Sequence, residues 1–336
     1  MTIRKFVVTG LSFVVAILGI SSAAAEITEL KIAKQPGLAY LPLMVMEHEK
    51  LFEKHIQAAG LDGVQVKWLT FAAGNVMNDA LLSGSLDIAS GGVAPLITLW
   101  AKSNAQVRGI AAQTTSEIYI NTRNPNVKSI KDFSDADRIA LPAAKVSVNA
   151  IVLQMAAEQA FGPGNANKLD RLTVSRSYAE GSAALLSGMG EINSAASALP
   201  FYTREMKTPG IHTVLRSYDV LGGPATNNLI WTTQKFHDEN PKVYAAFLAA
   251  YKEAIDLINR NPEKAAQIYQ AIEKSKVYSI DELVSMLSDK AKLEYTLVPR
   301  NITKYSDFMF RMGVIPRSPA SWKDLFFHEI HSLPGS

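Results

Sequence analysis

Glycine and small polar residues recur in this 336-residue chain at loops where a ligand would need close approach to the backbone. Gly74-Asn75, Gly92 and the pair Ser147 and Asn149 each lie between a strand-like segment and a helix-like one. In an open α/β sheet such loops lie beyond the carboxyl ends of the strands. They also lead into helix N-termini, whose free N–H groups and partial positive charge favour anions. The spacing therefore predicts a cleft for a small anion.

The residues predicted to contact the ligand all lie in or beside such loops. Lys145 adds a cation that would face the anion, although a solvated lysine is the alternative. Tyr40, Phe71 or Leu199 would line an apolar wall for an organic tail. Turn formation and helix capping explain many of the same residues, so both interpretations stay open for each one. The predicted ligand-binding residues are Gln35, Gly37, Tyr40, Phe71, Gly74, Asn75, Gly92, Val93, Thr115, Lys145, Ser147, Asn149 and Leu199.

Catalytic motifs are absent from the sequence, so we expect a binding protein without catalytic residues, metal or cofactor. There is no Gly-x-Ser-x-Gly elbow and no Walker loop, and Gly188-x-Gly190 continues to Asn193 where a third glycine would belong. His328 and His331 lack the four-residue spacing of a helical zinc site. The chain has no cysteine, which excludes disulfides, thiol nucleophiles and a lipoprotein anchor.

The first 25 residues are predicted to be a cleaved export signal. Arg4 and Lys5 precede an apolar run from residue 6 to 20, and Ala23-x-Ala25 is a small-residue cleavage site. An uncleaved anchor is the alternative, but the run is shorter than the roughly 20 residues that span a bilayer. Removing Arg4 and Lys5 from the 34 basic residues leaves 32 against 31 acidic ones. We therefore expect a soluble periplasmic monomer with no affinity for nucleic acid or membranes.

Strand-like and helix-like segments alternate along the chain, which predicts an α/β protein with doubly wound mixed sheets. The pattern runs to about residue 116, restarts after Asn124 and ends in a helical region with apolar spacing at Val243, Phe247 and Tyr251. Two lobes joined by a hinge of two crossings would explain the restart. Lobe 1 is predicted to comprise 26–116 and 228–336, lobe 2 to comprise 124–222, and the crossings to be 117–123 and 223–227.

Several helix boundaries are also legible. One helix is expected from residue 42 to 59. Asn240-Pro241 and Asn261-Pro262 each place a capping residue before a proline, and Ser279 with Glu282 has capping-box spacing.

The segment from Phe71 to Pro95 carries a family resemblance. It contains Phe71-x-x-Gly74, then Ala80-Leu81-x-x-Gly84-x-Leu86-Asp87-Ile88, then Gly92-x-Ala94-Pro95. This block resembles the nitrate, sulfonate and taurine type of ABC substrate-binding proteins, which has relatives similar to thiamine-pyrimidine synthases. The resemblance implies a type II periplasmic binding fold whose two lobes close on a small molecule. It also implies delivery of that molecule to a membrane permease driven by an ATPase.

Three departures from the family pattern bear on the ligand. Lys50 and Asn193 stand where a glycine and an aspartate are usual, and Leu199 stands where an aromatic residue is common. The expected function is capture of a small organic or inorganic anion of the sulfonate, carboxylate or nitrate class. The alternatives are a neutral pyrimidine-type heterocycle as ligand and a periplasmic sensor or docking role. The last alternative is a biosynthetic enzyme such as a pyrimidine synthase, for which the resemblance implies a cysteine-containing motif and a histidine donor, and this chain has no cysteine.

Overall fold

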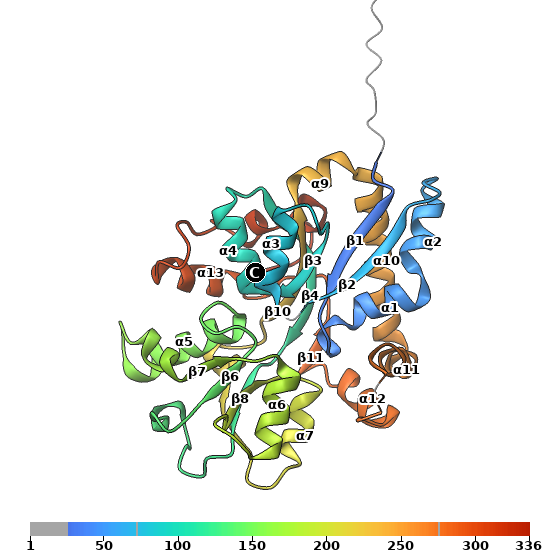
Figure 1. Ribbon diagram of the computed structural model, residues 1–336. Coiled ribbons are helices and arrows are strands. Elements are labelled where there is room, and N and C mark those ends of the chain that lie inside the picture. Colours follow the sequence, from blue (N-terminus) through green and yellow to red (C-terminus); the bar gives the residue numbers. More distant parts are fainter. Residues whose placement is uncertain (1–25, 72, 275) are drawn as a thin grey trace, which may run out of the picture.

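The computed structural model describes residues 26–71, 73–274 and 276–336 (Figure 1). The predicted export signal, 1–25, lies outside the described residues. Eleven strands form two larger sheets and one strand pair in this part of the chain, and helices cover them (Figure 1). The predicted α/β class with mixed sheets is confirmed. No helix among the described residues is long and apolar enough to cross a bilayer.

The first sheet is built around a long antiparallel strand, β10 (Thr226–Thr233), which pairs with β3 (Ala89–Gly92) on one side and β4 (Val107–Ser116) on the other. Its outer edge is β11 (Leu293–Tyr295), antiparallel to β4. Strand β10 arrives late in the chain and inserts between two earlier strands. All pairings within this four-stranded sheet are therefore antiparallel.

A parallel pair extends this sheet. Strand β1 (Glu29–Lys34) pairs with β2 (Gln65–Thr70). A parallel bridge between Ile32 and Ile88 joins β1 to the chain just before β3. The carboxyl ends of β1 and β3 consequently lie at the same edge, as the loops predicted to bind the ligand require.

The second sheet takes its strands from the middle of the chain. Its central strand β8 lies parallel to β6 and antiparallel to β5, while β6 also pairs in parallel with β7 and β5 pairs antiparallel with β9. In order across the sheet the strands are β7 (Thr173–Ser175), β6 (Ile139–Leu141), β8 (Ser194–Ser197), β5 (Tyr119–Thr122) and β9 (His212–Arg216).

The helices fall into groups that follow the two sheets. Helices α1, α2 and α10 pack together beside β1 and β2, with α11 and α12 next along the chain, and α5 to α7 lie with the second sheet (Figure 1). Their bounds are α1 (Leu41–Glu49), α2 (Leu51–Ala58), α3 (Gly74–Leu82), α4 (Val93–Lys102), α5 (Val148–Phe161), α6 (Tyr178–Ser187), α7 (Phe201–Met206), α8 (Ser217–Leu221), α9 (Gln234–Glu239), α10 (Pro241–Arg260), α11 (Pro262–Glu273), α12 (Ile280–Ser288) and α13 (Ile302–Arg311).

The single helix predicted from residue 42 to 59 is wrong. The chain breaks into α1 and α2 at Lys50, whose φ of 51° is left-handed. Its backbone N–H donates to Met46 O and closes the end of α1. This conformation favours glycine at a helix end, which explains the glycine that the family resemblance implies there. Lys50 is thus a feature of the helix break and not of the ligand.

The apolar stripe of α10 packs this helix onto the first sheet. Val243, Phe247 and Tyr251 are fully buried, as their spacing predicted. The Tyr251 hydroxyl also donates to Ala112 O on β4, at 3.3 Å. Burying side chains of this kind stabilises by about 1.5–3 kcal/mol each. The helix is thereby fixed against the first sheet.

Two short passages join the sheets. The first is Glu117 and Ile118, between β4 and β5. The second leaves α8 at Leu221 and reaches β10 at Thr226. At the first passage the guanidinium of Arg216, the last residue of β9, donates twice to the buried Glu117 carboxylate, from Nε to Oε1 at 2.9 Å and from Nη2 to Oε2 at 3.0 Å.

Candidate ligand-binding site

A cavity of about 40 Å³ lies where the two sheets face each other. Loops after β1, β2 and β3 supply one wall, and the loop after β6 with the start of α6 supplies the opposite wall. Its lining residues are Gln35, Tyr40, Ala73, Gly74, Asn75, Gly92, Pro95, Pro142, Ala143, Ser147, Val148, Asn149, Tyr178, Asn227 and Asn228. None of these described residues carries a charged side chain.

The structure brings about half of the predicted ligand-binding residues to this cavity. Those that line it are Gln35, Tyr40, Gly74, Asn75, Gly92, Ser147 and Asn149. Those that it does not place in the lining are Gly37, Phe71, Val93, Thr115, Lys145 and Leu199.

The residues outside the lining have other structural settings, and Phe71 is partly buried against the hydrophobic core. Val93 is buried as the first residue of α4, and Thr115 is buried within β4. The Gly37 N–H donates to Glu273 Oε1 at 3.4 Å. Lys145 is exposed, and its charge acts on Asp170, whose pKa burial nevertheless raises. The solvated alternative for Lys145 is therefore the better interpretation.

Three polar residues of the lining were absent from the sequence prediction. Asn227 and Asn228 stand at the start of β10, and Tyr178 is the first residue of α6. The adjacent amides at the start of a buried strand were a usable signal, because a strand that is buried on both faces has little reason to carry them. Their position opposite Tyr40 depends on the return of β10 into the first sheet.

Three helix N-termini converge on the cavity. Helix α3 begins at Gly74, α4 follows Gly92, and α5 follows Ser147. The Ser147 hydroxyl accepts from the Ala150 N–H at 3.3 Å and so caps α5. The first N–H groups of a helix have no acceptors within the helix, and together with the helix dipole they give a positive potential. Such a site favours an anion.

Close packing explains Gly74 and Gly92 of the lining and Gly91 beside it. A Cβ on Gly74 would lie 3.3 Å from Cγ of Pro95, and one on Gly91 would lie 3.1 Å from Cη2 of Trp231. Because these two glycines have no side chain, the Trp231 ring packs directly against the loops. Gly92 instead faces the other wall, where a Cβ would lie 2.9 Å from Cγ1 of Val148.

Hydrogen bonds within the lining hold two tyrosines in place. The Asn228 amide donates to the Tyr40 hydroxyl at 3.0 Å, and the Tyr178 hydroxyl donates to Asn149 Oδ1 at 2.8 Å. Burial raises the pKa of Tyr178 to about 12 and that of Tyr40 further. Both phenols are therefore neutral at physiological pH, and the lining stays uncharged.

One buried acceptor of the described cavity lining has no hydrogen-bond partner among the described residues. The Asn227 amide nitrogen donates to Ser116 Oγ at 3.0 Å, while Asn227 Oδ1 accepts no hydrogen bond there. A buried acceptor without a donor is costly. A ligand or ordered water with a donor group would satisfy it.

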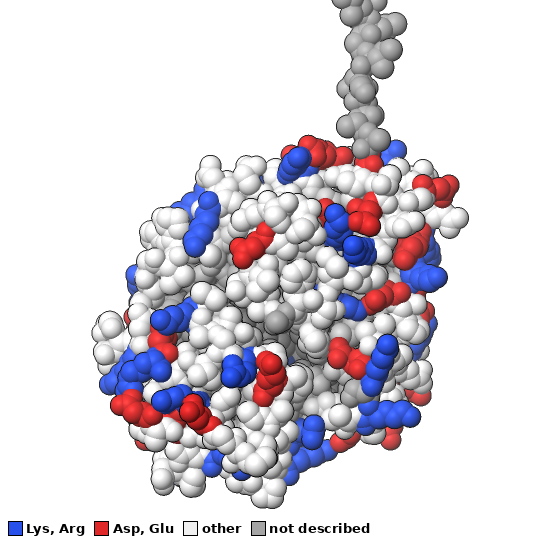
Figure 2. All heavy atoms as spheres, viewed as in Figure 1, with Lys and Arg blue, Asp and Glu red and all other residues white. Residues whose placement is uncertain are grey.

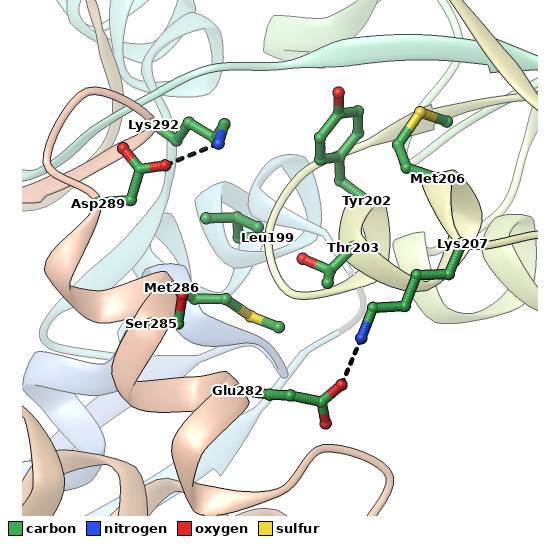
Figure 3. Close-up of a pocket in the computed structure, with 10 residues that line it drawn as sticks. All are labelled: Leu199, Tyr202, Thr203, Met206, Lys207, Glu282, Ser285, Met286, Asp289 and Lys292. Carbon is green, nitrogen blue, oxygen red and sulfur yellow. Dashed lines mark hydrogen bonds and ion pairs between the residues drawn. The ribbon is translucent and has the colours of Figure 1, made fainter.

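A larger cavity of about 420 Å³ lies between α7 and α12, with Leu199 in its lining (Figure 3). Charged groups border it: Lys207 Nζ lies 2.6 Å from Glu282 Oε1, and Lys292 Nζ lies 2.7 Å from Asp289 Oδ2. It is wider than the first cavity, but none of α3, α4 and α5 begins there. The smaller cavity, on which the three helix N-termini converge, is therefore the candidate ligand site.

Asn193 has a structural role away from the cavity. Its amide donates to Asp137 Oδ1 at 2.9 Å and its Oδ1 accepts from the Arg138 N–H at 3.1 Å. The interpretation of Asn193 as a residue that bears on the ligand is therefore not supported by its position.

Comparison with known proteins agrees with this geometry. Residues 62–265 match the family described as NMT1/THI5 like. The chain belongs to the NMT1/THI5-like family. A protein of Brachyspira hyodysenteriae described as an ABC transporter periplasmic binding protein is 24% identical over 261 residues, which are 74% of this chain and 70% of that protein.

Two solved structures show the same fold as this NMT1/THI5-like chain. The alkanesulfonate-binding protein SsuA from Xanthomonas axonopodis pv. citri, bound to MOPS, has a TM-score of 0.68 at 15% identity and covers 88% of this chain and 96% of its own. The nitrate-binding protein NrtA from Synechocystis PCC 6803 has a TM-score of 0.67 at 16% identity, covering 89% and 84%. The resemblance to sulfonate- and nitrate-type binding proteins is confirmed, and the fold is that of periplasmic binding proteins.

Proposed function

We propose that this NMT1/THI5-like protein is the periplasmic substrate-binding protein of an ABC importer and that its ligand is a small anion of the sulfonate, carboxylate or nitrate class. The observation that supports an anionic ligand is that the N-termini of α3, α4 and α5 converge on one cavity whose lining is uncharged. A carboxylate in the lining would oppose an anion, and the described lining holds none.

Neutral donors can supply enough binding free energy without arginine. A charge-assisted hydrogen bond contributes about 1.5–3 kcal/mol, and a favourable helix end adds about 0.3–1 kcal/mol. Three such bonds and two helix ends reach the roughly 8 kcal/mol of micromolar binding, from which the cost of association is subtracted. A modest affinity suits a protein that must release its ligand to a permease.

Capture would use the two-lobe arrangement. We propose that 26–116 with 228–336 and 124–222 move as two lobes about the passages near Glu117 and Leu221. Hinge closure of this kind concentrates large backbone changes in few residues. The cavity is small because its two walls already touch at Gly92 and Val148, and opening would admit the ligand.

The second candidate ligand is a neutral heterocycle of the pyrimidine type. It is favoured by the amide-rich lining, in which Gln35, Asn149 and Asn227 offer both donors and acceptors, and by the unpartnered Asn227 Oδ1. Such a ligand would bind through ring edges and the Tyr40 ring, and would be insensitive to the helix dipoles.

Calorimetry with matched ligands tests the proposal. An alkanesulfonate, the carboxylate of the same chain length, nitrate, a neutral aminopyrimidine and the matching alkylammonium would each be titrated into the protein. We expect saturable binding of at least one anion and none of the alkylammonium. Tight binding of the pyrimidine with no binding of any anion would overturn the anion assignment. Figure 2 shows both charge signs interspersed on the face viewed, so a broad electrostatic attraction should not mimic specific binding.

The transport role has its own test. Deleting the gene should abolish uptake of the bound ligand, and growth on it as sole nutrient source, if a permease and its ATPase depend on this protein. Unchanged uptake with loss of a ligand-dependent signal would instead support the sensor or docking alternative.

A further inference from the structure

A cluster of side chains far from the cavity has the composition of a metal site. Helix α9 carries His237, and the short helical turn His328–Ile330 carries His328 and Glu329. One ligand atom of each lies within 4.8 Å of the other two, and it is the one cluster of three such side chains found in the part of the chain that the structure describes. The two segments are 92 residues apart, so no local motif signals the site.

The distances suit a tetrahedral ion. Glu329 Oε1 lies 2.9 Å from His237 Nε2 and 3.6 Å from His328 Nδ1. Ligand atoms at about 2.0–2.1 Å from a tetrahedral Zn²⁺ are about 3.3 Å from one another. These two separations bracket that value and the third pair of ligand atoms lies within 4.8 Å, so side-chain rotations would complete the site.

Outer contacts already orient the first histidine. His237 Nδ1 lies 2.8 Å from Asp238 Oδ1, so Nδ1 keeps its hydrogen-bond partner when a metal replaces the proton at Nε2. This is the carboxylate–histidine–metal arrangement that raises ligand basicity. The His237 ring also stacks on Phe327 with centroids 4.3 Å apart and meets the Tyr244 ring edge-on at 4.6 Å.

The second carboxylate oxygen and the second histidine complete the arrangement. Glu329 Oε2 accepts from the Tyr244 hydroxyl at 3.4 Å, so this carboxylate is also oriented. The His328 side chain is 78% exposed, which leaves an open face for water as a fourth ligand. Three protein ligands with one open position are typical of zinc sites that are not purely structural.

We propose that His237, His328 and Glu329 bind a divalent transition metal ion such as Zn²⁺. The ion takes the place of the proton between His237 Nε2 and Glu329 Oε1, and that proton passes to solvent. Two imidazoles and one carboxylate are suited to Zn²⁺ and its neighbours and not to Ca²⁺ or Mg²⁺, which prefer oxygen. The bound ion would link the C-terminal turn that carries His328 and Glu329 to α9, and so hold it beside α10.

Zinc titration of tag-free, chelator-treated protein tests this site, because a histidine tag would bind the metal itself. We expect one Zn²⁺ per chain and a higher Tm in its presence. His328→Ala and Glu329→Gln should each weaken binding at least about tenfold, and Asp238→Asn by about 10- to 100-fold. The His328 side chain is exposed, so its removal leaves the fold intact for the comparison.

The matched control is His48→Ala. His48 is also exposed and lies 2.9 Å from a carboxylate, Glu49, yet it is not part of the three-residue cluster. Its replacement should leave zinc affinity unchanged. Absence of saturable 1:1 binding, equal affinity in the wild type and His328→Ala, or an equal loss in His48→Ala would each overturn the proposal. Ligand affinity at the cavity should not change with zinc, so the two proposals fail independently.

Discussion

Gly92 and Val148 meet across the cavity so closely that a Cβ on Gly92 would lie 2.9 Å from Val148 Cγ1. Gly92 caps α4 and Val148 begins α5. The N-terminus of α4 is thus packed against the first side chain of α5, from the opposite wall. A side chain at position 92 would separate the two groups of N–H donors that we assign to the ligand.

Gly92→Ala should weaken ligand binding while leaving the protein folded. The φ of Gly92 is −65°, which alanine adopts without strain, so the cost falls on the contact between the walls. Overpacking costs about 1–3 kcal/mol, which corresponds to a loss of affinity of roughly 5- to 150-fold. Calorimetry with whichever anion binds in the matched-ligand titration measures this loss. Adding Val148→Ala should restore most of the affinity, and a double variant as weak as Gly92→Ala would contradict this explanation.

Ser147→Asp tests the sign of the ligand charge. Aspartate caps a helix as well as serine does, so Tm should change little, while its carboxylate would stand beside the bound ligand. Two like charges about 4 Å apart repel by about 4 kcal/mol at a protein surface. We therefore expect anion affinity to fall by tenfold or more. Asn261→Asp adds the same charge at the cap of α11 and is the control. An unchanged affinity in Ser147→Asp would argue against an anionic ligand there.

The ion pair between Lys207, at the end of α7, and Glu282 of α12 is expected to contribute little to closure of the two proposed lobes. Lys207 Nζ lies 2.6 Å from Glu282 Oε1, but the two side chains are 62% and 36% exposed (Figure 3). Exposed pairs contribute little, so Lys207→Met should reduce ligand affinity by less than about fivefold. Lys54→Met, which breaks the exposed pair with Glu253, is the control. A loss of 100-fold would show that this contact controls closure.

Replacing either partner of the Glu117–Arg216 ion pair, at the first passage between the sheets, should lower stability by different amounts. The Glu117 side chain is 1% exposed and that of Arg216 is 54% exposed. Arg216→Met leaves a buried carboxylate without its counter-charge and should cost about 3–5 kcal/mol. Glu117→Gln should cost less, because the guanidinium can be rehydrated. Urea unfolding measures both, and equal costs would contradict the argument.

Asp137 should contribute to stability at neutral pH and not in acid. Burial acts to raise its pKa, but hydrogen bonds from Asn124, Ser134 and Asn193 lower it below the ordinary value. Because the pKa of Asp137 is lower in the folded state, its ionised carboxylate stabilises the fold at pH values above the unfolded-state pKa of about 3.9. This contribution is lost as pH falls from that value through the folded-state pKa. Asp137→Asn should therefore be less stable than the wild type at pH 7, with a difference that shrinks in acid.

Urea unfolding at several pH values measures this dependence. Asp62→Asn, in an exposed loop, should show no such change. A difference between Asp137→Asn and the wild type that stayed constant from neutral pH to acid would refute the role assigned to Asp137.

Local signals predicted the local structure well. Ser279 and Glu282 form the expected capping box, and the Asn261 side chain accepts from the Lys264 N–H at the start of α11. Asn240 shows the limit of such signals. Its side chain does not cap α10; Oδ1 accepts from the Ile27 N–H instead.

Tertiary structure supplied the missing cap of α10. Glu26 accepts from the N–H groups of Lys242 and Val243, at 3.1 and 2.7 Å. A residue more than 200 positions away thus satisfies the helix start, and no pattern near Asn240 could indicate it.

The sequence by itself determined the class of fold, the family and the loops that could hold a ligand, because the strand and helix periods and the Phe71 to Pro95 block are short-range features. Only the tertiary structure decided which loop residues meet. Asn228 reaches Tyr40 across 188 positions, and His237 reaches Glu329 across 92. The physical reason is that such contacts depend on where the chain returns, and that return is fixed by burial summed over both sheets and not by the residues that finally touch.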